Sequence, residues 1–167
     1  GLPLISLREK TKGVKMEATL KTSRNQISKN VKRLADRNEK NVLVYGCGRW
    51  VNEIKGKLSN DNVSTNWAWY EPNTEIYKTV PSGQFEHVVL DNVLNVIEND
   101  LIMMNALYNA WSKVQSMGSL WINIYEGSKS GKGEFTDSKC QRNAKKFDYL
   151  WAIRNLQGVK WRENLSG

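Results

Sequence analysis

The sequence predicts an α/β fold with an open, mostly parallel sheet and helices on both faces. Short runs of apolar, β-branched and aromatic residues alternate with segments whose apolar residues recur at helical spacing. This alternation is typical of strands joined by helical crossovers. The 167 residues suit one domain, and the 40% that are hydrophobic suffice for a core on each side of the sheet.

Four segments have the composition of strands and end at turn signals. The first runs directly into Gly-Cys-Gly, and the second is closed by Glu-Pro-Asn, because proline interrupts strand pairing. The predicted strands are residues 41–45, 66–70, 85–90 and 119–125, with a short final strand at 159–162.

Helical periodicity predicts four helices. Ser23 can cap the first, in which Ile27, Val31 and Leu34 form the apolar stripe. Gly118 suits the C-terminal cap of the third, and the last shows an apolar face. The predicted helices are residues 23–37, 50–58, 99–116 and 138–156, and the apolar face of the last consists of Phe147, Leu150 and Trp151. Residues 59–64 and 127–133 are predicted loops, and residues 1–22 are a predicted N-terminal arm before a domain at 23–167.

The formal net charge of +8 favours anionic partners, of which nucleic acid is the commonest. Basic residues gather in the first predicted helix, mostly off its apolar stripe: Arg24, Lys29, Lys32, Arg33 and Arg37. This face is either an anchor for a phosphate backbone or an ordinary solvated surface.

Several classes of site are disfavoured. Two cysteines, Cys47 and Cys140, make no disulfide framework, and the single histidine, His87, leaves no metal-ligand spacing. We expect His87 to be a core or edge histidine. The N-terminus has no secretory apolar region, and no apolar run approaches the ~20 residues of a membrane helix. The sequence therefore predicts a soluble cytoplasmic protein without a membrane or metal partner.

The loop after the first strand is the first candidate site. Glycine lacks a Cβ, so Gly46-Cys47-Gly48 can bring backbone close to a ligand, although a tight turn without ligand is the alternative. A missing third glycine argues against NAD. Glu71 follows the second strand, where open α/β folds place a carboxylate for ribose hydroxyls. Together these features predict a nucleoside site.

Three ordered segments resemble motifs of class I S-adenosylmethionine-dependent methyltransferases, which have a Rossmann-like fold. They are residues 41–49, 69–73 and 85–97. More narrowly, the chain resembles compact bacterial and phage methyltransferase-like proteins. These share the Tyr-Gly-Cys-Gly-Arg loop, a Val-Leu-Asn-Val segment and a glycine- and serine-rich stretch, which is residues 125–133 here. The resemblance covers about residues 41 to 145.

The resemblance implies S-adenosylmethionine as cofactor and methyl transfer as reaction, in the cytoplasm of a bacterium or a phage-infected cell. The backbone of the glycine loop would line the methionine part, Glu71 would hold the ribose, and the segment after the third strand would lie beside the adenine or the methyl group. The implied cofactor residues are Tyr45, Gly46, Cys47, Gly48, Glu71, Pro72, Asp91, Asn92 and Val93. Tyr125 and Glu126, at the carboxyl end of the fourth strand, are the candidate catalytic residues.

The sequence departs from this family in two places, and two further observations bear on the acceptor. Trp50 replaces a third glycine and is expected to narrow or cover the cofactor loop. Only 12 residues separate Pro72 from Phe85, so the sheet should lack its usual edge strand there. The amino-methyltransferase motif Asp/Asn-Pro-Pro-aromatic is absent, and a buried Cys47 is a poor nucleophile for cytosine-C5 chemistry.

Three functions stay open. The first is a methyltransferase acting on nucleic acid. The second is a non-catalytic module that binds S-adenosylmethionine, nucleic acid or protein, for example as a viral accessory protein. The third is an enzyme that consumes S-adenosylmethionine without a macromolecular acceptor.

Overall fold

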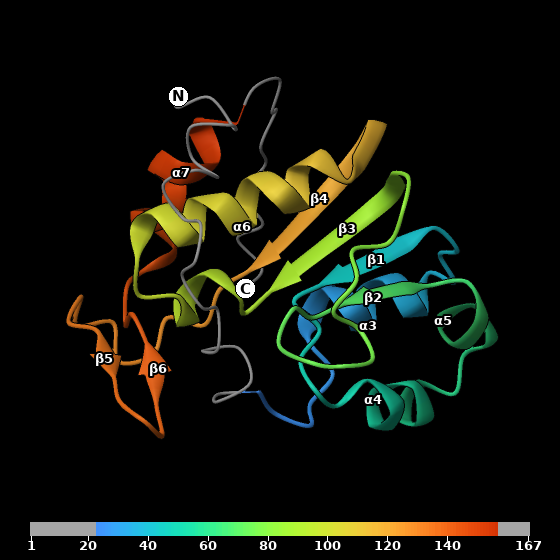
Figure 1. The fold of residues 1–167 in the computed structure, drawn as a ribbon, viewed down its shortest axis with the longest axis horizontal. Helices are drawn as coiled ribbons and strands as arrows, with labels where there is room; N and C mark the ends of the chain where they lie inside the picture. The colour runs from blue at the N-terminus through green and yellow to red at the C-terminus, as the bar shows by residue number, and fades with distance from the viewer. Residues whose placement is uncertain (1–22, 157–167) are drawn as a thin grey trace.

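A four-stranded sheet, all of whose strands run parallel, forms the centre of the molecule (Figure 1). The computed structural model describes residues 23–156. The strands lie in the order β2-β1-β3-β4. They are β1 (Val42–Tyr45), β2 (Ala68–Tyr70), β3 (Phe85–Asp91) and β4 (Val114–Asn123). The predicted parallel α/β fold is confirmed, and each predicted strand within these residues is present with shifted ends.

Helices cover both faces of the sheet, as predicted. On one face lie α3 (Lys29–Asp36), α4 (Val51–Leu58) and α5 (Asp61–Thr65), and on the other lie α6 (Asp100–Ser112) and α7 (Leu150–Arg154) (Figure 1). Alternate residues of β1 point to opposite sides, because side chains alternate along a strand. Val42 and Val44 pack with α3 and α4, whereas Leu43 and Tyr45 pack with α6.

The sheet is short at the β2 edge. Residues 71–84 contain neither helix nor strand, so β2 is the edge strand of the described sheet. The backbone N–H of Glu71 donates to the carbonyl of Tyr77 at 2.8 Å, which folds this segment back on itself. The abbreviated edge predicted from the 12-residue spacing is therefore confirmed.

Two predictions near the N-terminal end are wrong. The first helix begins at Lys29 with Ser28 in the N-cap position, whereas residues 23–28 are irregular and Ser23 caps no helix. Residues 59–64 are not a loop, because Asn60 caps the short helix α5. Its side-chain oxygen accepts from the backbone N–H groups of Asn62 and Val63.

The third predicted helix is too long at its C-terminal end. Helix α6 ends at Ser112, and Val114 already pairs with Phe85 in the sheet. Gly118 is not a helix cap but lies in β4, where a side chain would collide with a backbone carbonyl, since its Cβ would lie 2.7 Å from Glu86 O. The register between β3 and β4 shifts at this point.

The last predicted helix is largely wrong. Its first half contains the strand β6 (Cys140–Gln141), which pairs antiparallel with β5 (Glu134–Phe135) just before the predicted helix. The 3₁₀ helix η2 (Lys146–Tyr149) and α7 follow. Phe147 and Trp151 are not an apolar core face, because they are 74% and 43% exposed. A second 3₁₀ helix, η1 (Leu94–Val96), follows β3 and contacts β6. The predicted arm at 1–22 and strand at 159–162 lie outside the described residues.

The helices of the described region are all too short or too polar to cross a membrane.

Candidate functional site

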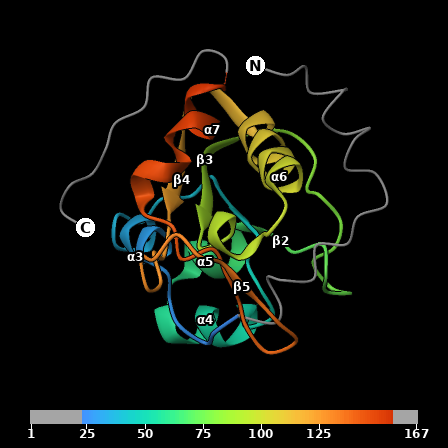
Figure 2. The ribbon, with the colours of Figure 1, turned by 90° about the vertical axis from the view of Figure 1, so that its left-hand side faces the viewer.

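A cavity of about 730 Å³ opens at the carboxyl end of the sheet. Most of its lining residues fall into three groups: the ends of β1, β3 and β4, the irregular residues 23–28, and the hairpin side formed by residues 127–143. The strand arrowheads in Figure 1 point toward this end, and Figure 2, which looks onto it, shows the hairpin in front of the sheet. Open α/β sheets bind ligands at this edge.

The glycine loop forms one wall of the cavity. Gly46 and Gly48 have φ values of +78° and +72°, a region that only glycine occupies at little cost. The N–H groups of Gly46 and Cys47 both donate to the carbonyl of Tyr70, at 2.7 and 3.0 Å, so β2 holds the loop in this shape. Gly46, Cys47 and Gly48 all line the cavity, whereas the Tyr45 side chain is buried in the core.

Glu71 lies behind the loop rather than in the cavity. Its side chain is fully buried, and one carboxylate oxygen accepts from the backbone N–H of Gly48 at 3.0 Å. The other oxygen accepts from the backbone and side-chain nitrogens of Asn73, at 3.4 and 3.3 Å. Neither Glu71 nor Pro72 is among the lining residues. In this arrangement Glu71 positions the loop. To contact a ribose, its carboxylate would have to give up the hydrogen bond from Gly48 N or accept a second hydrogen bond at the same oxygen.

Asp91 lies at the end of β3 and is the one carboxylate among the described residues that line the cavity. Its two oxygens accept from the backbone N–H and the side-chain amide of Asn30, at 2.9 and 2.8 Å. Burial raises the pKa of Asp91 above its ordinary value, and these hydrogen bonds oppose the shift only in part. Asn92 also lines the cavity, while Val93 is buried beneath Gly46.

Residues 23–28, here called the strap, run across the glycine loop. The carbonyl of Ser23 accepts from the indole N–H of Trp50 at 3.3 Å, and Lys57 donates to the backbone and side-chain oxygens of Asn25, at 2.7 and 3.0 Å. A Cβ on Gly48 would collide with the Ser23 hydroxyl. Trp50 does not line the cavity. Its ring therefore anchors the strap rather than filling the cofactor loop.

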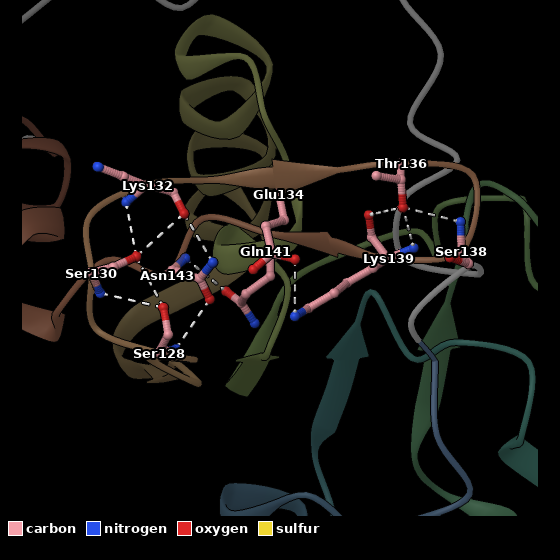
Figure 3. A network of polar contacts seen from close by, with 9 residues as sticks. All are labelled: Ser128, Ser130, Lys132, Glu134, Thr136, Ser138, Lys139, Gln141 and Asn143. Carbon is pink, nitrogen blue, oxygen red and sulfur yellow. Dashed lines mark hydrogen bonds and ion pairs between the residues drawn. The ribbon is translucent and has the colours of Figure 1, made fainter.

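The opposite wall is built around Asn143. Its side-chain oxygen accepts from Ser128 N at 3.1 Å, and its amide donates to the carbonyl of Lys132 at 2.9 Å (Figure 3). A Cβ on Gly127 would collide with that oxygen. The loop at residues 127–133, predicted from its glycines and serines, is thus held by a side chain that follows β6.

The two candidate catalytic residues have different environments. Tyr125 lines the cavity and is 64% exposed. Glu126 does not line it, since one oxygen accepts from the backbone N–H of Lys146 at 2.8 Å and the other lies 3.9 Å from the Lys129 ammonium. The structure brings Tyr125, but not Glu126, to the cavity.

Cys47 is held as a thiol. Burial, followed by the negative charge of Glu71, raises its pKa to about 12. Because the thiolate is the nucleophile, this environment disfavours covalent chemistry at Cys47.

One cluster outside the cavity has metal-ligand chemistry. The ligand atoms of Glu39, Glu86 and His87 lie within 4.8 Å of one another, and His87 Nε2 is 3.4 Å from a Glu39 oxygen. However, the indole N–H of Trp121 donates to His87 Nδ1 at 3.0 Å, so Nδ1 carries the lone pair and Nε2 the hydrogen. Binding a metal through Nε2, the nitrogen that faces the two glutamates, would require the hydrogen on Nδ1 instead. The bond from Trp121 therefore disfavours a metal at this cluster.

Sequence reasoning missed Asn30, the strap and the hairpin wall. Asn30 is 61 positions from Asp91 in the chain, and no local pattern marks it as a partner. For the hairpin wall, one sequence signal was Gly127. A glycine at this position indicates that another group lies too close for a side chain, and in the structure that group is Asn143. Comparisons of the chain with protein-family models, curated proteins and solved structures found no match.

Proposed function

We propose that this chain binds S-adenosylmethionine in the cavity and transfers its methyl group to nucleic acid. One observation carries the proposal: the glycine loop after β1 and Asp91 after β3 line a single cavity at the carboxyl end of a parallel sheet. This is where open α/β folds hold nucleoside ligands. The motif resemblance that suggests the cofactor involves the same two strand ends.

The size and polarity of the cavity support a nucleoside-sized ligand. Its volume of about 730 Å³ lies within the range of ~300–1,000 Å³ common for small-molecule sites. Two of its lining residues hold buried polar atoms that have no hydrogen-bond partner in residues 23–156: Trp69 Nε1, a donor, and Asn95 Oδ1, an acceptor. Unpaired buried polar atoms are costly, and a polar ligand or water would satisfy them after a small adjustment of the wall.

The residues of the site suffice for methyl transfer in principle. Displacement at a sulfonium carbon mainly requires that the donor and acceptor be held in line. Among the described residues that line the cavity, Asp91 is the one carboxylate, and its raised pKa makes it a stronger base than an ordinary surface aspartate. We assign it the role of accepting a proton from the acceptor, in preference to Glu126, which does not line the cavity; to do so Asp91 must release one of its two bonds to Asn30. Tyr125 would contact the acceptor.

Nucleic acid is the proposed acceptor because positive charge borders the cavity. Arg24 and Lys29 line it, as does Lys139, which pairs with Glu134 at 3.2 Å, and the chain carries a net charge of +8. Phosphate groups are the anions that such a border attracts most generally.

Titration calorimetry with S-adenosylmethionine and with its demethylated product tests the cofactor. The full chain should bind both, and Gly48→Val should abolish binding because valine is strained at φ +72° and would displace Ser23. Gly56→Ala is the matched control, since Gly56 has no neighbour within 4 Å of its added Cβ. No heat from the wild-type chain at millimolar ligand would refute the proposal.

A non-catalytic module on the same fold is the second candidate. It is favoured by the engagement of Glu71 with Gly48 and of Glu126 with Lys146, which leaves neither carboxylate among the cavity-lining residues. Binding of the cofactor without transfer of a labelled methyl group to DNA, RNA or protein would support it. Loss of cofactor without any methylated product would instead indicate an enzyme that consumes S-adenosylmethionine alone.

A further inference from the structure

We infer that the nucleic acid is single-stranded and that it crosses the mouth of the cavity between the basic face of α3 and two exposed rings, Tyr125 and Phe147. This inference deepens the proposed function and rests on its assignment of nucleic acid as acceptor. Three features carry it: a basic surface along α3, two exposed rings, and the cavity that both Lys29 and Tyr125 line.

The basic side follows α3. Arg24 and Lys29 line the cavity, and Lys29 also borders a surface hollow whose lining residues are all charged: Lys29, Lys32, Arg33, Asp36 and Arg37. The one acid among them, Asp36, pairs with Lys32 at 3.0 Å. The hollow therefore has a net positive charge. Because Lys29 borders both the hollow and the cavity, the two together offer a basic path along which phosphate groups could bind.

The aromatic side combines two segments that are distant in the chain. Tyr125 is 64% exposed and lines the cavity, and Phe147 is 74% exposed. The hydrogen bond from Lys146 N to Glu126, at 2.8 Å, joins the immediate neighbours of these two rings. Lys145 and Lys146 are themselves exposed beside Phe147. Exposed rings interleaved with lysines are typical of surfaces on which successive unpaired bases stack.

The position of the reacting centre disfavours a paired base. Asp91 is half-buried at the end of β3, and the acceptor atom must enter the cavity to come close to the methyl donor. A base stacked inside a duplex cannot reach such a position unless it leaves the stack. In a single strand a base can enter the cavity without the free-energy cost of leaving a duplex. Neighbouring bases can then stack on the rings of Tyr125 and Phe147.

Fluorescence anisotropy tests this with a labelled DNA strand of about 20 nucleotides, the corresponding RNA strand, and the DNA strand annealed to its complement. We expect either single strand to bind at least about tenfold more tightly than the duplex. Tyr125→Ala and Phe147→Ala should each weaken single-strand binding by roughly five- to a hundredfold, whereas Tyr125→Phe keeps the ring and should bind nearly as wild type. Met117→Ala is the control, because Met117 is 99% exposed but lies in β4 away from the mouth.

The outcomes separate this inference from the proposed function. Equal affinity for single strand and duplex, or unchanged single-strand affinity in both alanine variants, would overturn the inference. No nucleic-acid binding by a chain that binds S-adenosylmethionine in the calorimeter would overturn it as well, and would leave the cofactor assignment intact. Ring-dependent single-strand binding without cofactor binding would support the inference while the methyltransferase proposal fails.

Discussion

The contact between Gly46 and Val93 gives a quantitative test of the glycine loop. In Gly46→Ala the new Cβ would lie 2.5 Å from Val93 Cγ2, far inside the normal separation of about 3.5–4.0 Å. Val93 is 2% exposed and packed in the core, so it has little room to move away. The backbone of Gly46 is also left-handed, at φ +78°.

Two costs add in this variant. A non-glycine residue in the left-handed region costs about 1–2 kcal/mol, and overpacking a core contact costs about 1–3 kcal/mol. Gly46→Ala should therefore reduce the free energy of unfolding by roughly 2–5 kcal/mol. Val93→Ala should reduce it by about 2 kcal/mol, because two buried methyl groups are lost and a small cavity is left.

The double variant Gly46→Ala/Val93→Ala isolates the contact. It keeps the backbone cost but removes both Cγ atoms, and the remaining distance from the new Cβ to Val93 Cβ is an ordinary 3.6 Å. Its loss should be smaller than the sum of the single losses by roughly 1–3 kcal/mol. Urea unfolding followed by tryptophan fluorescence measures all four proteins, with Gly56→Ala as the control that is neutral or slightly stabilising. If the loss of unfolding free energy in the double variant equals the sum of the two single losses to within about 0.5 kcal/mol, Gly46 does not pack closely against Val93.

Three further predictions concern single residues. Alkylation of Cys47 in the native protein should be roughly 1,000-fold slower than in the urea-unfolded chain at the same pH, because its pKa is raised from 9.0 to about 12; equal rates would contradict the buried thiol. Burial raises the pKa of Asp91, so its contribution to stability is complete below the unfolded value and is lost as the pH rises through the folded value. The unfolding free energy of wild type minus that of Asp91→Asn should therefore fall as the pH rises above the ordinary pKa of an aspartate, and a rise would show that hydrogen bonding outweighs burial. Asn99→Ala should cost about 1 kcal/mol in thermal or urea unfolding, because the Asn99 side chain accepts from Leu101 N and Ile102 N at the start of α6; no loss would contradict the cap.

The parallel sheet was predictable because each of its strands carries its own signal. The buried run before Gly46 is Val-Leu-Val-Tyr, and the three residues before Asp91 are Val-Val-Leu, as expected for strands that are covered on both faces. The spacing of only 12 residues between Pro72 and Phe85 predicted that the sheet ends at β2. These signals are local, and no tertiary contact was needed to interpret them.

The errors occur where tertiary contacts override local patterns. Residues 113–118 continue the helical spacing of α6, yet the pairing of Val114 with Phe85 starts the strand there. The segment around Phe147 has helical spacing, but the preceding residues pair as a hairpin and leave that ring exposed. The polar residues 59–64 were predicted as a loop, but the Asn60 side chain caps the short helix α5 there.

The candidate site was predictable only in its strand-end residues. Gly46, Gly48 and Asp91 follow buried strands, and the common direction of those strands brings them together. The environment of each could not be inferred, because it comes from remote parts of the chain. Asn30 approaches Asp91 from α3, and the burial of Glu71 behind Gly48 depends on how tightly the loop closes.

The strap gives the cavity a built-in reporter of occupancy. Its first four residues, 23–26, belong to no helix or strand and are attached mainly by the bonds to Trp50 and Lys57, whereas Ile27 packs against the core and Ser28 hydrogen-bonds to Asp91. Amide hydrogens in residues 23–26 should therefore exchange with solvent long before those of β1 or β3. A ligand that touches both strap and sheet must leave before the strap opens. At a ligand concentration of 100 times its Kd, exchange there should slow by roughly a hundredfold. Exchange in this one segment would thus measure binding even for a ligand whose chemistry is unknown.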